Sequence, residues 1–464
     1  MSEEQKRLLE KQLWAVANVL RGKMNADEYK NYILGFIFYK YLSEKLERYA
    51  NEKLLAREDF KFADIKENSK DGKQYLDFIK ESCIDHLGFF LKPTQLFSYL
   101  VSKGQGNVKG EGAFILEDLK NILNSIEQTS MGTASEDDFK GLFDDVDLTS
   151  SKLGSTEQKK NNVIVEVLAL LSGIDFKLED SKSDLLGDAY EYLIGEFAAG
   201  AGKKGGEFYT PAQVSRLLAQ IVSVGKKRVK TVYDPTCGSG SLLLRLKDYV
   251  EVSNYFGQEL NPTTYNLARM NMILHGVHFD HFKIKQGDTL TEDMLPDLKA
   301  EAVVANPPFS AKWKGDSDPQ LVHDDRFSQY GRLSPKGAVD YAFVTHMLYH
   351  LSDNGTMAVV LPHGALFPGA QTFERFGHNE PDPPVAILVV DQEIRMVDVE
   401  GTNPGSSSVD VPSLGRNPEE EPGVEIRQGF NVRFLFLQLR DEHLHAGVEM
   451  VVECIGEEQQ ADDA

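Results

Sequence analysis

A short apolar stretch that runs into two prolines constrains the fold more than any other feature of this chain. Residues 302–305 are small and apolar, as in a buried strand, and Asn306, Pro307, Pro308 and Phe309 follow directly. Proline lacks the N–H that a central strand needs, and the residue before it is pushed to extended geometry. We therefore predict a parallel strand that stops at Asn306, with this motif at the carboxyl edge, where open α/β sheets bind ligands.

The motif suits an amino group on a flat conjugated ring. The Asn306 side-chain oxygen and the Pro307 carbonyl oxygen can each accept one hydrogen of an exocyclic NH₂, which frees the nitrogen lone pair for attack. Phe309 offers a face on which the ring can stack. The alternative is that Asn-Pro-Pro only begins a loop.

The region around the motif alternates strands and helices. Apolar runs and helical spacing predict strands at 229–233, 252–258, 281–286, 301–305 and 355–361, and helices at 183–198, 212–223, 241–249, 261–275 and 338–351. This β-α-β order indicates an α/β fold with a parallel, doubly wound sheet. We place this domain at residues 166–370.

Residues 1–165 are predicted to form a helical N-terminal domain. Apolar residues recur at helical spacing from Leu8 to Leu20. Asn25 fits an N-cap with Glu28 as its capping-box partner, and the helix that follows carries a broad apolar stripe, so we expect it to be buried on most sides. Further helices are predicted at 73–90, 113–127, 136–143 and 157–172.

Residues 371–464 differ in composition from the rest of the chain. They hold 20 Asp and Glu against six Arg and no Lys, in a chain of net charge −22. An apolar run at 385–390 and a near alternation at 430–439 resemble strands, and 400–424 is predicted to be disordered. The composition favours an atypical acidic segment, frameshifted or fused. Nucleic-acid binders are more often basic, so a DNA substrate would be held by local patches or by a partner subunit.

The remaining composition excludes several classes of protein. No apolar run is long enough to span a membrane, and the first residues lack a signal-peptide core. The three cysteines lie far apart and the 11 histidines form no metal-binding pattern, so we predict no disulfide framework and no metal site. Together these features predict a cytoplasmic protein.

A second candidate site follows the first predicted strand. Asp234 leads into a turn with Gly238, Ser239 and Gly240, where a backbone free of side chains can approach a ligand and a helix begins. A dinucleotide fingerprint would place a third glycine at 243, which is leucine here. The turn therefore suits a cofactor with a carboxylate, such as S-adenosylmethionine, although strand–glycine–helix turns are common without any ligand.

Acidic residues end the next two strands. Glu259 could bind both hydroxyls of a ribose, and Asp288 could accept a hydrogen bond from an adenine amine. Taken singly, each is more readily interpreted as an exposed strand-end carboxylate, but their order along the chain favours a cofactor site. Upstream, a helix start with Thr210 as N-cap and Pro211 as first helical residue adds a wall for the cofactor, formed by Glu207, Phe208, Tyr209, Thr210 and Pro211.

These segments, in this order, resemble the γ-class amino-methyltransferases of DNA. Stretches at 32–34, 38–42, 186–192 and 340–343 narrow the resemblance to the modification (M) subunit of type I restriction–modification enzymes. It covers about residues 1–370. Beyond residue 369 the family continues with a further sheet strand and a helical tail, neither of which is found in this sequence.

The resemblance implies methyl transfer from S-adenosylmethionine to N6 of an adenine flipped out of double-stranded DNA. Asn306, Pro307, Pro308 and Phe309 would hold the base. It also implies two M subunits on a specificity (S) subunit that reads the sequence, and a restriction (R) subunit for cleavage. The alternatives are a cofactor-binding scaffold without turnover, or a methyltransferase for another planar NH₂ in cytosine (N4), RNA guanine or protein glutamine.

The 28 residues from Ser310 to Gly337 form an unusually long connection, and such loops are often functional. We predict a flap whose Lys312 and Lys314 contact DNA phosphates while Trp313 stacks or fills space near the flipped base. Arg326, later in the connection, adds to its positive charge. The alternative is a solvated surface loop with incidental charges.

Overall fold

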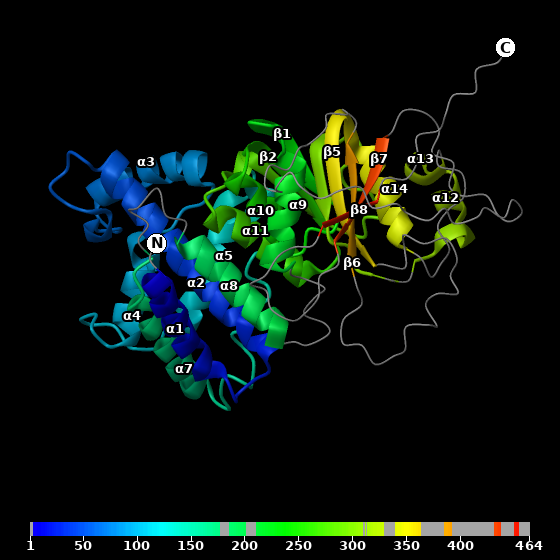
Figure 1. Cartoon of the computed structure of the whole chain (residues 1–464). Helices are drawn as coiled ribbons and strands as arrows, with labels where there is room; N and C mark the ends of the chain where they lie inside the picture. Colours follow the sequence, from blue (N-terminus) through cyan, green and yellow to red (C-terminus); the bar gives the residue numbers. More distant parts are fainter. Residues whose placement is uncertain are drawn as a thin grey trace, which may run out of the picture. The chain divides into compact units, whose positions relative to one another are not determined.

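The computed structural model describes residues 3–176, 185–200, 210–309, 311, 313–328 and 339–362, and the strands at 385–391, 431–437 and 450–453 (Figure 1). Contacts divide the chain into two compact units. The first comprises Met1–Pro211, Cys237–Leu244 and Asn254–Gln286, and the second comprises Ala212–Thr236, Arg245–Ser253 and Gly287–Ala464. These units follow contacts rather than sequence order, so the domain ranges given above stay predictions.

Helices dominate the first unit, as predicted. They are α1 (Glu3–Leu20), α2 (Ala26–Tyr49), α3 (Lys70–Leu87), α4 (Phe97–Gly104), α5 (Leu116–Ser130), α6 (Glu136–Phe139), α7 (Glu157–Ser172) and α8 (Leu185–Gly200). Helix α4 is the one that the sequence patterns missed. The predicted cap of α2 is present, because the Asn25 backbone N–H donates to Glu28 Oε2 at 3.1 Å. Ile33, Phe36 and Ile37 of α2 are fully buried, which confirms that this helix forms the core.

The first unit also contains part of the parallel sheet. Strands β2 (Glu251–Glu259) and β3 (Phe282–Gln286) pair in parallel, with Glu259 opposite Gln286. Helix α11 (Pro262–Leu274) connects them and contacts α2 and α8. Tyr41 of α2 donates from its hydroxyl to the Ile273 carbonyl oxygen at 2.9 Å, which ties the helical region to this part of the sheet.

The second unit holds the other predicted strands. Its strand order is β1-β4-β5-β6-β7-β8, with β1 (Arg228–Asp234), β4 (Ala300–Ala305) and β5 (Leu351–Pro362) parallel. Helices α9 (Ala212–Ser223) and α14 (Asp340–His350) both pack on β4 and β5 (Figure 1). Residues 302–305 of β4 are completely buried, so both faces of this strand are covered, as in a doubly wound fold.

The acidic segment and the connection after Phe309 depart from the expectations only in part. Strands β6 (Val385–Asp391) and β7 (Asn431–Leu437) coincide with the two stretches that resembled strands, whereas β8 (Met450–Glu453) was not expected. All three extend the sheet in antiparallel order. The expected long loop after Phe309 contains short helices α12 (Pro319–Val322) and α13 (Asp325–Ser328). Among the described helices, none combines the length and the apolar character that crossing a membrane requires.

Candidate active site

The glycine turn in the first unit has the backbone that the sequence predicts. Gly238 and Gly240 adopt φ values of 54° and 77°, which side chains disfavour. A Cβ on Gly240 would lie 3.2 Å from Met272 Cε of α11, a contact that a small shift of this flexible side chain would relieve, so the positive φ rather than space requires the glycine. The Cys237 backbone N–H donates to the Gln258 carbonyl oxygen at 3.0 Å and fastens the turn to β2.

The helix after this turn is shorter than expected. Helix α10 spans only Ser241–Arg245, against the predicted 241–249, and a 3-10 turn follows it. The Asn271 side chain donates to the Ser239 carbonyl oxygen at 3.0 Å and holds the turn from α11. The short helix adds little dipole to the turn, and the N–H groups of Cys237, Gly238 and Gly240 already donate to Gln258, Glu259 and Cys237.

Glu259 lies at the carboxyl end of β2 and contacts the same turn. Its Oε2 accepts from the Gly238 N–H at 3.0 Å, and its Oε1 accepts from the Asn261 N–H at 2.8 Å. The side chain is only 9% exposed, and this burial raises the pKa of Glu259 against the lowering effect of the backbone N–H groups of Asn261, Gly238 and Leu260. Each carboxylate oxygen keeps a lone pair, so the group can still accept two hydroxyl donors.

In the second unit, Asp234 and Asp288 each shape a turn. Asp234 is buried, and its Oδ1 accepts from the Thr236 N–H at 2.9 Å. The Asp288 Oδ1 accepts from the Leu290 N–H at 3.1 Å. The Thr289 hydroxyl donates to the Pro235 carbonyl oxygen at 2.5 Å and so joins the two turns, which bring Asp234 and Asp288 to one region of this unit.

The motif that begins at Asn306 follows β4, as predicted. Because β1 and β4 are parallel and paired at Tyr233 and Val303, Asp234 and Asn306 lie at the same edge of the sheet. Pro307 is buried, Pro308 is exposed, and Asn306 and Phe309 are half-buried. Among the described residues, none forms a hydrogen bond with the Asn306 side chain. This amide is therefore available for a ligand.

The other predicted site residues are only partly described. Glu207, Phe208 and Tyr209 lie outside the described residues, and so does Lys312. Helix α9 begins at Ala212, one residue after the expected first position at Pro211, and Thr210 is half-buried. Trp313 packs edge-on against Phe327 with ring centroids 5.7 Å apart. Lys314 is exposed and lies 3.4 Å from Asp318.

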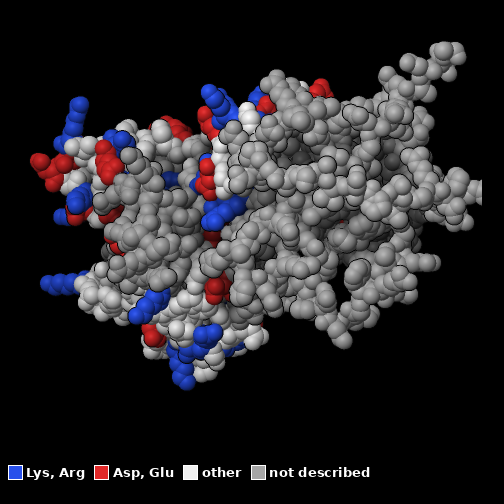
Figure 2. Space-filling model, viewed as in Figure 1, with Lys and Arg blue, Asp and Glu red and all other residues white. Residues whose placement is uncertain are grey.

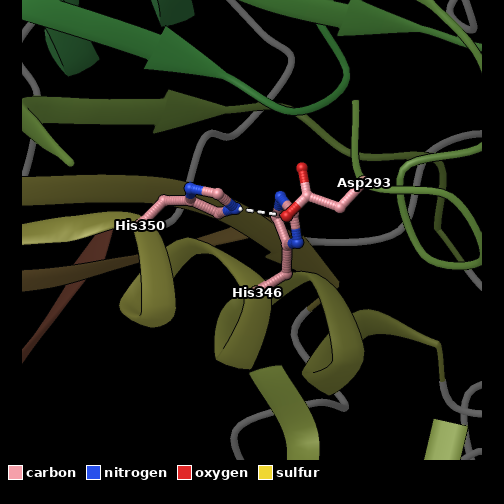
Figure 3. A group of neighbouring side chains, drawn as sticks. All are labelled: Asp293, His346 and His350. Carbon is pink, nitrogen blue, oxygen red and sulfur yellow. Dashed lines mark hydrogen bonds and ion pairs between the residues drawn. The ribbon is translucent and has the colours of Figure 1, made fainter. Parts of the chain in front are cut away.

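The sequence patterns missed a cluster in which Asp293, half-buried, meets the buried His346 and His350, shown in Figure 3. The two histidines are one turn apart on α14, and both are 0% exposed. Three potential ligand atoms of the cluster lie within 4.8 Å of one another, which is the geometry of a candidate metal site. The signal in the sequence was the pair of histidines at i and i+4 in an apolar helix.

The partners of the two histidines indicate a hydrogen-bonded network. His350 Nδ1 is 2.8 Å from the Leu298 carbonyl oxygen, and its Nε2 is 3.0 Å from Asp293 Oδ2. Arg326 Nη1 donates to His346 Nδ1 at 3.1 Å, so the neutral ring carries its hydrogen on Nε2, 2.8 Å from the Tyr233 hydroxyl. A cation here would displace these bonds and meet the Arg326 charge, so we assign the cluster to structure.

Lowering the pH should destabilise the second unit through His346. Burial, with His350 and Arg326 beside it, holds the pKa of His346 well below its usual range, and Asp293 opposes this only in part. The unfolded chain binds a proton at this position below about pH 6.5, and the folded chain does not. The free energy of unfolding should therefore decrease as the pH is lowered, by at most about 1.4 kcal/mol per pH unit.

Chemical unfolding, followed by Trp313 fluorescence in a Trp14→Phe background, measures this effect because the chain has two tryptophans. Between about pH 7 and pH 5, His346→Asn should remove the contribution of His346 to the slope of unfolding free energy against pH. His323→Asn, at an exposed position, should leave that slope unchanged. Burial raises the pKa of Asp293, but its hydrogen bond with His350 and the Leu295 N–H bring it down to about 2, so it stays ionised here. Equal slopes for the parent and His346→Asn would contradict the prediction.

Comparison with known proteins places this chain in a family. Residues 181–374 match the N-6 DNA methylase family, and residues 9–171 match the HsdM N-terminal domain. The type I restriction enzyme MpnII methylase subunit of Mycoplasma pneumoniae is 40% identical over 381 residues, covering 78% of this chain and 69% of that protein. The MjaIX methylase subunit of Methanocaldococcus jannaschii is 28% identical over 373 residues, covering 78% of this chain and 62% of that protein.

A solved structure agrees. The type I restriction–modification system methyltransferase subunit of Streptococcus thermophilus superposes with a TM-score of 0.68 at 41% identity, covering 78% of this chain and 76% of that one. The fold, with the Asn306–Phe309 motif at the carboxyl edge of its sheet, thus defines a methyltransferase of the N-6 DNA methylase class. More narrowly, the chain belongs to the methylase subunits of type I restriction enzymes. The family match ends at residue 374, four residues into the acidic segment at 371–464.

Proposed function

We propose that this chain transfers a methyl group from S-adenosylmethionine to N6 of an adenine in DNA, within a type I restriction–modification complex. One observation carries the proposal. Asn306 and Pro307 follow the buried strand β4 at the edge that it shares with β1, in a chain of the N-6 DNA methylase class. The Asn306 amide is half-buried and available for a ligand, as a base-binding residue needs to be.

The residues present fit S-adenosylmethionine on chemical grounds. The backbone at Gly238 and Gly240 is free of side chains and can approach a carboxylate. Glu259 can accept from both ribose hydroxyls with the lone pairs that Gly238 and Asn261 leave. Asp288 would accept from the adenine amine, with Glu207–Pro211 as a wall. When bound, the cofactor supplies an electrophilic methyl group on a sulfonium sulfur.

The protein's own contribution to the reaction is positioning. The adenine has to leave the DNA stack before its N6 can be reached, and Phe309 offers the flipped ring a new stacking partner. The Asn306 side-chain oxygen and the Pro307 carbonyl oxygen accept the two N–H groups. The amine is then held away from the ring plane with its lone pair free, and no general base has to act first.

The proposed partners follow from the family and from the charge of this chain. We expect an S subunit that reads the sequence, a second M subunit, and an R subunit that joins for cleavage. With a net charge of −22, we expect the chain to bind DNA weakly by itself. Figure 2 shows acidic and basic side chains interspersed on the described part of one face, without a large basic patch there. Much of the grip on DNA would then come from the S subunit.

Mass spectrometry of digested DNA tests the reaction. The full chain, its S subunit, DNA and S-adenosylmethionine should yield N6-methyladenine. N4-methylcytosine, or methylation of RNA guanine or protein glutamine in place of DNA, would contradict the proposal. Calorimetry addresses the scaffold alternative: cofactor binding without transfer to any DNA, with or without the S subunit, would favour it. The match to N-6 DNA methylases favours adenine.

Neutralising the start of the segment after Phe309 should weaken binding of the M–S complex to DNA. Lys314 is exposed, and only Asp318 pairs with it among the described residues. Phosphate contacts carry no sequence information but release counterions. Lys312→Ala with Lys314→Ala should therefore weaken specific and non-specific binding alike. The slope of log affinity against log salt concentration should become less steep by up to about two units.

Fluorescence anisotropy over a salt series measures that slope. Lys70→Ala with Lys73→Ala removes the same charge from exposed positions on α3 and serves as the matched control. Cofactor affinity should stay unchanged in both double variants. If the two double variants share the slope of the parent, the segment does not contact the DNA backbone.

A further inference from the structure

Arg326 is a buried cation in the connection for which the sequence suggested a flap against DNA. It lies on α13 and is 5% exposed. All five guanidinium N–H groups have acceptors. Nε and Nη2 donate to the Asp324 carboxylate, Nη1 to the Thr289 carbonyl oxygen and to His346 Nδ1, and Nη2 also to the Leu290 carbonyl oxygen, at 2.6–3.1 Å. Such complete pairing leaves no N–H for a phosphate.

What Arg326 holds is the loop that carries Asp288. Its two carbonyl acceptors, Thr289 and Leu290, directly follow this proposed cofactor ligand. The Leu290 N–H donates to Asp288 Oδ1, and the Thr289 hydroxyl donates to the Pro235 carbonyl oxygen, three residues before Gly238 in the chain. A displacement of Arg326 would therefore be felt at Asp288 and at the start of the glycine turn.

Apolar packing joins the same loop to the segment after Asn306-Pro-Pro-Phe. The buried residues of this apolar cluster are Leu290, Leu321, Phe327, Val339, Ala342 and Phe343. Ala311 and Trp313, two and four residues after Phe309, pack against this cluster. The loop after Asp288 and the segment after the base-binding motif thus share one small core, and Arg326 donates to the carbonyl oxygen of one of its members, Leu290.

We infer that Arg326 is a positioning residue that couples cofactor binding at Asp288 to the ordering of the segment after Phe309. The inference rests on the proposed function for its ligand. A guanidinium is required because lysine has three N–H groups in a tetrahedral arrangement, which cannot reach Asp324, the two carbonyl oxygens and His346 together. Arg326→Lys therefore keeps the positive charge and loses most of these hydrogen bonds.

Calorimetry with S-adenosylmethionine on the full chain tests the inference. Arg326→Lys should raise the dissociation constant on the order of tenfold, the lower end of what one charge-assisted hydrogen bond is worth. With the S subunit present, KM for the cofactor should rise by a similar factor, while kcat at saturating cofactor stays within about threefold of the parent. Arg228→Lys, at an exposed ion pair on the amino end of β1, is the matched control and should bind as the parent does.

A second pair of variants leaves Arg326 itself unchanged. Thr289→Val removes the hydroxyl that donates to Pro235, and Thr289→Ser keeps it. The valine variant should bind the cofactor more weakly, and the serine variant should restore affinity. In hydrogen exchange, the cofactor should protect 313–328 in the parent and protect it less in Arg326→Lys.

Three results would overturn the inference. They are parental affinity in both Arg326→Lys and Thr289→Val, equal loss in Thr289→Ser and Thr289→Val, and cofactor protection of 313–328 that Arg326→Lys leaves unchanged. If Arg326→Lys does not fold, the two Thr289 variants decide. A parent chain that does not bind S-adenosylmethionine at all would instead overturn the proposed function, and the inference with it.

Discussion

Replacing Asn306 by alanine should abolish methyl transfer to DNA and leave cofactor affinity unchanged. The side-chain oxygen is useful only when the amine is in place, so its loss acts on the transition state more than on binding. Removing one preorganised polar contact to a reacting group costs about a hundredfold to a thousandfold in rate. We expect a loss of that size in single-turnover methylation, measured with the S subunit present.

Two variants frame this result. Asn306→Asp keeps an oxygen acceptor at the same position and should retain more activity than the alanine variant. Asn162→Ala removes an exposed asparagine on α7 and should methylate as the parent does. Parental methylation by Asn306→Ala would show that Asn306 does not hold the base. Loss of cofactor binding in the same variant would show that its role is structural.

The sheet and the site motifs could be predicted because their signals are local. Strand β4 ends at Ala305 because Pro307 and Pro308 cannot continue a central strand. Helix α11 begins after Asn261, whose side chain accepts from the Thr264 N–H at 3.1 Å, as an N-cap does. The glycines at 238 and 240 indicate a turn with positive φ, and the structure has that φ at both positions. Each signal lies within a few residues of the element it specifies.

The parts that escaped prediction depend on distant contacts. Arg326 reads as a surface charge, and its burial is possible only because Thr289, Leu290 and His346 bring acceptors from elsewhere in the chain. Asp293 and His350 are 57 residues apart, so neither indicates the pair that they form. The pairing of β6 with β5 likewise depends on long-range register, which an apolar run alone does not determine.

Removing the Glu259 carboxylate should weaken S-adenosylmethionine more than any other single change in the proposed cofactor site. Glu259→Ala loses two charge-assisted acceptors for the ribose, and it also frees the Gly238 N–H from its partner in the turn. We expect a loss of about 2–3 kcal/mol in binding free energy, measured by calorimetry. Glu259→Gln keeps one acceptor oxygen and should lose less.

The pH dependence of cofactor affinity distinguishes a role of Glu259 in binding the ribose from a purely structural role. Burial raises the pKa of Glu259, and two hydroxyl donors favour its ionised form, so affinity should fall as the pH is lowered toward that raised pKa. Glu259→Gln cannot titrate and should bind with little dependence on pH over the same range. Glu251→Gln, exposed at the amino end of the same strand, should reproduce the parent curve. An unchanged dissociation constant in Glu259→Ala would place Glu259 outside the cofactor site, with the fixing of the Gly238 turn as its remaining role.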